Sequence, residues 1–345
     1  MVKFLKELIV NKENLLFNIK EIKKRITKSN YTIIAVVKGN GYGLGIVPYT
    51  KFLSENGINF FGISSIEEAI KLRDSGINEN LIILTPFIDK SEVEILIKNN
   101  IILTIDSYES AKIANAIAKE QNKTILAHIK IDTGLSRYGF TYSSTNEIYT
   151  IIKECNNIIF EGIFSHLSNS LAKDNSWSIL QFNRFTKITN ELKNLGIKFK
   201  YEHICNSSGF FKYPNMHLNC ARIGSAFLGS AYGSGNFLKH IGTFHTKISR
   251  IKQLSKGDII GYGNSYIVNK STKIAIIHTG YFDGIGITLE DQRFKFLSKA
   301  KRVFIDFKKL FSNDFIYLKI NGKLYKVLGQ IRNVWYYYWY YRWKL

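Results

Sequence analysis

The stretch LIILTPFIDKSEVEILIKNNIILTID (81–106) contains the pattern that decides the fold. LIILT (81–85) and IILTID (101–106) are short apolar runs typical of buried strands. KSEVEILIKNN (90–100) lies between them with the apolar spacing of an amphipathic helix, and its closing asparagines suit a C-cap. A strand, a helical crossover and a second strand predict two parallel strands in one sheet.

The same alternation extends through the first two-thirds of the chain. Eight short runs rich in Ile, Val and Phe are predicted strands, and amphipathic helical patterns fill most of the gaps between them. The runs are IIAVVK (33–38), FFGISS (60–65), LIILT (81–85), IILTID (101–106), ILAHIKID (125–132), FEGIFSH (160–166), FKYEHICN (199–206) and CARIG (220–224). Eight is the number that closes a TIM-type barrel, whereas an open doubly wound sheet is the alternative. Because no GxGxxG follows a strand, we expect an α/β fold of the (β/α)8 barrel type.

A mostly β pattern begins at about residue 237. Its runs read as strands, and turn signals at KGD and NGK separate them. The runs are GTFHTKISRIKQL (242–254), DIIGYGNSYIV (258–268), KIAIIHTGY (273–281), KRVFIDF (301–307) and DFIYLKINGKLYKVLGQI (314–331). The predicted domains are therefore a barrel at 1–236, which ends in the linker GSAYGSGN (229–236), and a β-rich domain at 237–345.

Composition narrows the class of protein. The 345 residues are 45% hydrophobic and 22% charged, which is typical of a globular protein, and no apolar run is long enough for a membrane span. The 3 cysteines lack CxxC spacing and the N-terminus lacks a secretory pattern, so we expect a cytoplasmic protein without disulfides or a metal site. The net charge is +21, but the lysines are dispersed along the sequence and form no basic cluster. This distribution argues against nucleic acid or a membrane as partner, whereas anionic small molecules remain plausible ligands.

Polar and reactive side chains gather where the predicted strands end. They are Lys38, Lys130, Asp132, Arg137, His166, His203, Asn206, Ser207, Arg222, Gly224 and Ser225. Taken singly, each suits a structural role, because a strand-end lysine is usually solvated and a lone histidine is more often structural than catalytic. In a closed barrel, however, chemistry occurs at the C-terminal ends of the strands, so these residues would converge on one mouth.

The chemistry of these side chains indicates a cofactor. A lysine on a barrel strand can form a Schiff base with a carbonyl compound. Backbone N–H groups beside glycine near the eighth strand suit a phosphate. Pyridoxal 5′-phosphate (PLP) carries both an aldehyde and a phosphate, so it fits this combination. The residues alone indicate no particular reaction.

One motif connects these residues to a known family. AVVKGNGYGLG (35–45) resembles the PLP-lysine signature of alanine racemases. Further matches follow in family order: HIKIDTGLSRYGF (128–140), GIFSHLS (162–168), HICNSSGF (203–210), ARIGSAFLG (221–229), DIIGYGNSY (258–266) and HTGYFDGIG (278–286). The resemblance implies a PLP barrel of fold type III, a C-terminal β-domain, and a homodimer whose active sites are completed across the interface. Racemases that accept serine share these motifs.

The resemblance also implies roles for single residues. Lys38 would hold the cofactor covalently and act as one of two bases. Phosphate contacts would come from Tyr42, Ser207, Gly224 and Ser225. His166 would lie against the pyridine ring and Arg222 would face its nitrogen, with Asn206 and His203 as supports.

Racemisation removes a proton from one face of Cα and returns it on the other, so two acid/base groups on opposite faces are expected. By the resemblance, the second base is Tyr262 of a partner subunit. Arg137 would position the Tyr262 phenolate and the substrate carboxylate, and Lys130 matches a position that is carbamylated in some members. Tyr281 would shape the substrate entrance.

The end of the chain departs from the family. VLGQI (327–331) resembles the strand that leads into the family's GR-[IV]-x-M-D stretch, but the Met-Asp pair is absent. NVWYYYWYYRWKL (333–345) shows neither helical nor strand alternation. We therefore expect a truncated or frameshifted, incomplete C-terminal domain, atypical from about residue 332, and a poorly soluble or weakly dimerising protein.

Several functions stay open at this point. The first is an alanine racemase that uses Lys38 and Tyr262 as its two bases, with serine as the nearest alternative substrate. The second is a truncated relative that binds PLP with little or no activity. The third is a basic nucleic-acid-binding protein without catalysis.

Overall fold

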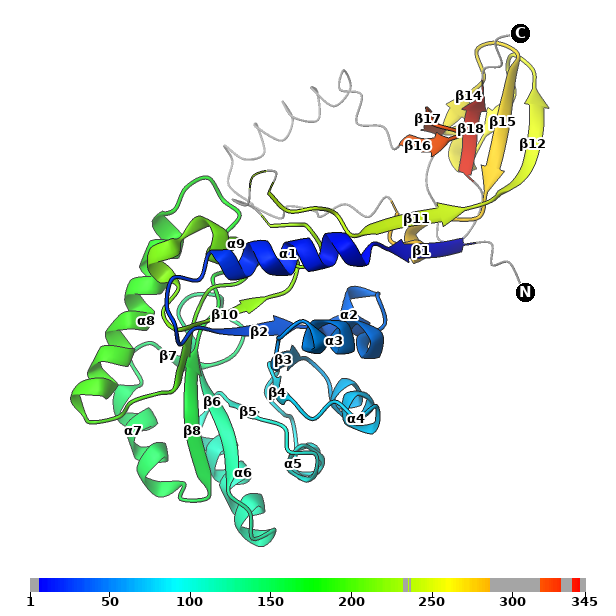
Figure 1. The fold of residues 1–345 in the computed structure, drawn as a ribbon. Helices are drawn as coiled ribbons and strands as arrows, with labels where there is room; N and C mark the ends of the chain where they lie inside the picture. The colour runs from blue at the N-terminus through cyan, green and yellow to red at the C-terminus, as the bar shows by residue number, and fades with distance from the viewer. Residues whose placement is uncertain (1–5, 232–234, 236, 286–316, 330–336, 342–345) are drawn as a thin grey trace. The chain divides into compact units, whose positions relative to one another are not determined.

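The computed structural model describes residues 6–231, 235, 237–285, 317–329 and 337–341 (Figure 1). The chain divides into two compact units, Val10–Gly242 and a second that joins Met1–Ile9 to Thr243–Leu345. The predicted domains place this division a few residues earlier, and they leave the N-terminal residues with the barrel. In the structure, β1 (Lys6–Val10) pairs with β11 (Gly242–Thr246) in a two-stranded sheet, which joins the N-terminus to the second unit.

The first unit is built on eight parallel strands, one in each of the predicted apolar runs. They are β2 (Thr32–Val36), β3 (Phe60–Ile63), β4 (Asn80–Ile83), β5 (Leu103–Ile105), β6 (Ile125–Asp132), β8 (Ile158–Phe164), β9 (Tyr201–His203) and β10 (Cys220–Ile223). Their order is β4-β3-β2-β10-β9-β8-β6-β5, and the short β7 (Phe140–Thr141) pairs with β6. The expected α/β architecture is therefore confirmed.

The ring of strands is nearly closed where its ends, β4 and β5, meet. A single parallel bridge joins Ile82 to Ile102. The Ile102 N–H donates to the Leu81 carbonyl at 2.8 Å, and the Ile83 N–H donates to the Ile102 carbonyl at 3.1 Å. The buried Thr104 hydroxyl adds a bond to the Ile83 carbonyl at 2.6 Å. An open doubly wound sheet would leave these two edges apart, so that alternative is wrong.

Helices surround the strands, as Figure 1 shows for α4 to α8. They are α1 (Lys12–Lys24), α2 (Lys38–Tyr42), α3 (Ile46–Glu55), α4 (Ile66–Asp74), α5 (Lys90–Lys98), α6 (Tyr108–Glu120), α7 (Thr145–Glu154), α8 (Ser176–Asn194) and α9 (Ser207–Lys212), with the 3-10 turn η1 (Pro214–Met216). Ser65, Asp89 and Ser107 accept backbone N–H bonds at the starts of α4, α5 and α6. The longer helices pack their apolar faces on the strands, as α5 does with Val93, Leu96 and Ile97, and this packing forms the core.

The second unit is mostly β. Its elements are β11, β12 (Ile248–Leu254), β13 (Ile259–Ile260), η2 (Tyr262–Asn264), β14 (Tyr266–Ile267), β15 (Thr272–Ile277), η3 (Tyr281–Asp283), β16 (Tyr317–Ile320), β17 (Lys323–Leu328) and β18 (Tyr337–Tyr341). One sheet has the order β12-β15-β18-β17-β16, and a small core contains Ile260, Ile274 and Leu328. The predicted strand at 301–307 and part of the linker at 229–236 lie outside the described residues. No helix in the described ranges combines the length and apolarity needed to cross a bilayer.

The aromatic run near the C-terminus contains a strand despite its lack of alternation. Tyr337–Tyr341 forms β18, which pairs antiparallel with β15 and β17. Backbone hydrogen bonds to a neighbouring strand on each side can hold a strand in a sheet without any alternation of polar and apolar side chains. Aromatic residues also favour the extended backbone of a strand. β15 is distant in sequence from β18, and a search for local alternation detects neither this pairing nor the one with β17.

The hydroxyl bond at the seam of the barrel can be tested by Thr104→Val. This change keeps the shape of the side chain and removes its bond to the Ile83 carbonyl, so the free energy of unfolding should fall by about 1 kcal/mol. Thr50 is the matched control, because its hydroxyl is equally buried and has no hydrogen-bond partner in the part of the chain that the structure describes. Thr50→Val should leave denaturant unfolding unchanged or slightly more stable. Equal losses in the two variants would contradict the role of the seam bond.

Candidate active site at the mouth of the barrel

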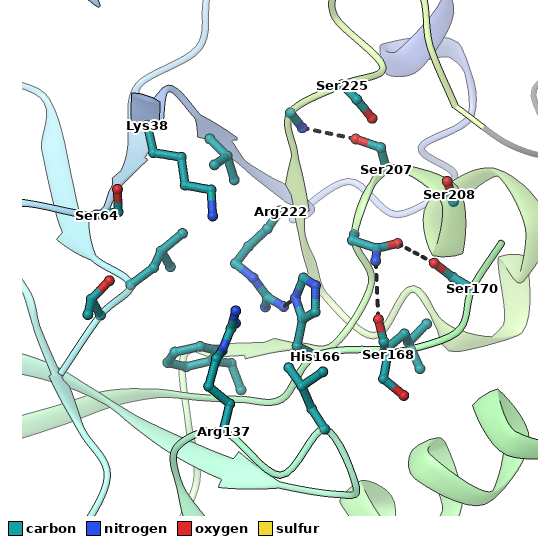
Figure 2. Close-up of a pocket in the computed structure, with 18 of the residues that line it drawn as sticks. Lys38, Ser64, Arg137, His166, Ser168, Ser170, Ser207, Ser208, Arg222 and Ser225 are labelled. Carbon is teal, nitrogen blue, oxygen red and sulfur yellow. Dashed lines mark hydrogen bonds between the residues drawn. The ribbon is translucent and has the colours of Figure 1, made fainter. Parts of the chain in front are cut away.

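A cavity of about 700 Å³ opens at the C-terminal ends of the barrel strands (Figure 2). Its lining comes entirely from the first unit and includes four basic side chains, Lys38, Lys130, Arg137 and Arg222. No aspartate or glutamate is among the described residues that line it. Because the cavity concentrates positive charge without a carboxylate, it is suited to bind anionic groups.

Lys38 is the first residue of a tight turn after β2. The residues from Gly39 to Tyr42 all have positive φ, between +53° and +67°, so this turn is left-handed. Glycine adopts this conformation without steric cost, and asparagine tolerates it. Asn40 is held by its N–H, which donates to Glu68 at 3.0 Å, and by its side-chain oxygen, which accepts from the Ile46 N–H at 3.1 Å. The turn therefore has a defined geometry, and Figure 2 shows the Lys38 side chain extending into the cavity.

A group of small polar residues forms one wall of the cavity. Asn206 caps α9, and the Ser207 hydroxyl accepts from the N–H groups of Gly224 at 3.0 Å and Ala226 at 3.2 Å. A Cβ on Gly224 would collide with the hydroxyl of Tyr42, so the absence of a side chain lets this hydroxyl approach the backbone. With Ser225, these residues offer hydroxyl and N–H groups of the kind that bind a phosphate.

Arg222 is buried on β10 behind the cavity. It donates to Nδ1 of His166 at 3.1 Å, to the Ser165 carbonyl at 2.6 Å and to Nδ1 of His203 at 2.5 Å. Burial lowers the pKa of Arg222 to about 10, so it stays charged at neutral pH. Burial, and then the charge of Arg222, lower the pKa of His166 to about 3, and this ring is therefore neutral. Figure 2 shows the two side chains adjacent at the back of the cavity.

Arg137 lies at the mouth, on a loop whose backbone is held by hydrogen bonds to two side chains. The Asp132 carboxylate accepts from the N–H groups of Gly134 and Ser136 at 2.8 and 3.1 Å. Arg184 donates to the carbonyl of Thr133 in the same loop at 3.0 Å. These bonds fix the loop, and the Arg137 side chain is directed at the cavity in Figure 2.

Lys130 is the most deeply buried amine of the lining, at 4% exposure. Its ammonium donates to the Leu84 carbonyl at 3.3 Å and lies over the rings of Tyr138 and Phe164. It forms no ion pair with any carboxylate in the described ranges. Burial first, and then the charges of Arg137 and Arg222, lower its pKa to about 8. This amine therefore becomes neutral, and so nucleophilic, at a lower pH than an ordinary lysine.

The cavity brings together the predicted site residues of the first unit, apart from two. Asp132 holds the loop that carries Arg137, and the supporting His203 lies behind Arg222. Those that line the cavity are Lys38, Tyr42, Lys130, Arg137, His166, Asn206, Ser207, Arg222, Gly224 and Ser225. Tyr262 and Tyr281 belong to the second unit, where Tyr262 begins η2 and is 71% exposed, and Tyr281 begins η3 and is 39% exposed.

The sequence interpretation missed several lining residues, among them Ser64, Thr85, Tyr138, Ser168 and Ser170. Ser64 directly follows β3 and Thr85 lies two residues after β4, so the strand-end argument could have included them. The others lie in loops after longer strands, and their sequence carries no comparable signal.

Comparison with known proteins gives a consistent result. The model described as alanine racemase, N-terminal domain, matches residues 10–231, and that described as alanine racemase, C-terminal domain, matches residues 241–306. The alanine racemase of Clostridium tetani is 36% identical over 299 residues, which cover 85% of this chain and 76% of that protein. The solved alanine racemase of Clostridium difficile 630 has a TM-score of 0.84 at 26% identity, over 100% of this chain and 85% of its own. The alanine racemase of Bartonella henselae, solved with covalently bound pyridoxal phosphate, is alike in fold, with a TM-score of 0.80 at 21% identity over 98% and 86% of the two chains.

The lowered pKa of Lys130 predicts a pH-dependent stability. Between pH 8 and 10.5 the unfolded chain holds this proton and the folded chain releases it, so stability rises with pH across this window. In bicarbonate-free buffer, Lys130→Met should raise the free energy of unfolding at pH 7 by up to about 3 kcal/mol. This gain should disappear as the pH approaches 10.5. The exposed Lys51 provides the control Lys51→Met, which should show no such trend. A gain for Lys130→Met that is independent of pH would refute this explanation.

Proposed function

Because the chain belongs to the alanine racemase family, we propose that it interconverts L- and D-alanine with pyridoxal 5′-phosphate as cofactor. The observation that supports this most strongly is the cavity, which joins an accessible lysine, a wall of hydroxyl and N–H groups and three further cations. The cofactor's phosphate and the substrate's carboxylate are anions that such a lining would stabilise. Serine is the nearest alternative substrate, since serine-accepting racemases share the motifs.

The residues present fit the cofactor at both of its ends. Lys38 would hold it through the amine, and the wall that contains Tyr42, Ser207 and Gly224 would hold the phosphate. His166 is neutral and accepts from Arg222, so it offers an uncharged ring surface. Arg222 can only donate hydrogen bonds, so a pyridine nitrogen facing it would remain an acceptor. The chemistry that the bound cofactor supplies is withdrawal of the electron pair that deprotonation leaves on the substrate Cα.

The remaining work is the transfer of protons, for which we propose two bases. The Lys38 amine would remove or return the proton on one face of Cα, and the Tyr262 phenol would do so on the other. Arg137, held at the mouth by its loop, would bind the substrate carboxylate. Each turnover would leave one base protonated and the other deprotonated, which suits a reaction that runs in both directions.

The proposal includes a homodimer in which Tyr262 acts on the site of the partner subunit. It rests on the resemblance to the family, and the exposure of Tyr262 in the single chain agrees with it. Tyr281, also of the second unit, would then shape the entrance of the substrate.

The two bases can be tested with L-alanine and PLP by measuring D-alanine. Lys38→Ala should abolish D-alanine formation and the visible absorbance of bound PLP, because the covalent attachment is lost. Tyr262→Phe should keep the absorbance and reduce the rate strongly, because only a proton donor is removed. Lys51→Ala and Tyr317→Phe change exposed residues outside the cavity and should behave like the parent.

Full activity in Lys38→Ala would exclude the mechanism. PLP absorbance without D-alanine in the parent would favour the inactive relative, and D-serine formed in preference to D-alanine would favour a serine racemase.

Combining Lys38→Ala and Tyr262→Phe chains in one dimer tests the shared site. A dimer of one Lys38→Ala chain and one Tyr262→Phe chain contains one site with both native bases, provided that Tyr262 serves the partner. Co-expression of differently tagged chains should therefore restore up to about half of the parental activity per mixed dimer, by this count of sites. If both bases act within one chain, every site lacks one base and the mixture stays inactive.

Lys130 is expected to react with carbon dioxide. Its neutral nitrogen would attack the carbon of CO₂ and release a proton to solvent, which leaves a carbamate anion beside Arg137. With ¹³C-bicarbonate, the ¹³C NMR spectrum should show one carbamate signal in the parent that is absent from Lys130→Arg, whose guanidinium is not nucleophilic. The same signal in both proteins would place the carbamate on another amine.

A further inference from the structure

A line of buried polar side chains runs through the barrel interior behind the cavity. It begins at Arg222 on β10, whose guanidinium contacts Nδ1 of His203 on β9 at 2.5 Å. Nε2 of His203 lies 2.9 Å from Nδ1 of His128 on β6. Nε2 of His128 in turn lies 3.7 Å from the Glu161 carboxylate on β8. Four residues on four neighbouring strands thus connect the cavity wall to one acidic group.

The donors and acceptors along this line can be ordered in only one way. A guanidinium only donates, so Nδ1 of His203 must accept and carry no proton. His203 is then a neutral ring with its proton on Nε2, which it donates to Nδ1 of His128. His128 is likewise neutral, with its proton on Nε2 and directed at Glu161. Burial lowers the pKa of both histidines, which agrees with neutral rings.

The barrel is shaped to hold these two rings. A Cβ at Gly162 of β8 would lie 2.5 Å from Nδ1 of His128, so a glycine at this position makes room for the imidazole. Phe164 stacks on His203 with 5.0 Å between ring centroids, and Tyr201 stacks on His128 at 5.5 Å. These contacts pack closely against both rings and hold each ring in its orientation.

Glu161 is the only carboxylate that this line of contacts reaches. Its side chain is 10% exposed, and the exposed Lys200, which directly precedes β9, approaches it at 3.6 Å. Nε2 of His128 has no hydrogen-bond partner within the described residues, and the Glu161 carboxylate at 3.7 Å is the acidic group that it approaches. Arg222 itself forms no ion pair with a carboxylate in these ranges. The charge of Arg222 is therefore balanced only at a distance.

We propose that Glu161 is a positioning residue that acts on Arg222 through His128 and His203. As the acceptor nearest the Nε2–H of His128, at 3.7 Å, its carboxylate favours the same tautomers that Arg222 requires, and so it stabilises the guanidinium in its place behind the cavity. Its charge also opposes that of Arg222 without placing an anion in the cavity. The inference uses the proposed function only for the role of Arg222 toward the cofactor ring; the tautomers do not depend on it.

The tautomers can be read directly in the full-length protein. The chain has 7 histidines, so ¹⁵N-histidine labelling gives a tractable spectrum in which long-range ¹H–¹⁵N couplings distinguish Nδ1–H, Nε2–H and doubly protonated rings. Signals are assigned with His128→Gln and His203→Gln. In the parent, both rings should be neutral Nε2–H tautomers between about pH 5 and 8, with or without PLP. An Nδ1–H or doubly protonated His203 would overturn the proposal, whatever the enzyme activity.

Variants of Glu161 separate positioning from a merely structural role. Glu161→Gln keeps an oxygen acceptor and should retain both tautomers. Glu161→Met removes the acceptor, so His128 and His203 should become mixtures of tautomers, and the affinity for PLP should fall several-fold. Glu202→Met is the control, because it removes a half-buried carboxylate from β9 outside the line.

Two results of this series would count against the proposal. In the first, Glu161→Met keeps the tautomers of the parent and loses as much unfolding free energy as Glu202→Met does. Glu161 would then have a structural role alone. The other is Glu161→Gln with the tautomer mixture of Glu161→Met, because the amide oxygen would then fail to replace the carboxylate. If Glu161→Met does not fold, the tautomers of the parent and of Glu161→Gln still decide the question.

Discussion

Closure of the parallel strands into a ring is the constraint on which the site depends. The ladder is continuous from β4 round to β5, and the last junction rests on one backbone bridge between Ile82 and Ile102 and the hydroxyl of Thr104. Because every strand runs in the same direction, ring closure places all of their C-terminal ends at one mouth. Lys38 and Arg222, which are distant in sequence, come to line the same cavity for this reason, since β2 and β10 are neighbours in the ring.

Local periodicity was sufficient to predict the barrel and insufficient for the end of the chain. Each barrel strand is a short apolar run between helical patterns, and the run itself signals its burial on both faces. β18 carries no such signal, because its place in the sheet depends on partners in β15 and β17 and not on its own pattern. The lesson is specific: a run such as Tyr337–Tyr341 lacks alternation and can still be a strand when ladders on both edges define it.

The site shows the same division between local and distant information. Strand-end residues such as His166 and Ser207 could be predicted, because barrel geometry brings strand ends together. The line from Arg222 to Glu161 could not, because His128 is in mid-strand and its ring fits the interior only through the missing side chain of Gly162. The spacing of residues in the sequence does not reveal that Gly162 lies opposite His128. The two residues belong to different strands, and only the fold defines the register between them.

The distance of Glu161 from the cavity has an electrostatic consequence. A carboxylate beside Arg222 would neutralise it locally, and it would also repel the anionic groups that the cavity is suited to bind. Two neutral imidazoles keep the acidic group on the far side of the barrel interior, so that Arg222 has an opposing charge and the mouth remains cationic. The folded barrel therefore holds a cluster of partly uncompensated positive charge whose natural complement is a ligand. Binding of the proposed phosphate and carboxylate would stabilise this folded state over the unfolded chain, so the concentrated positive charge would become the source of the affinity.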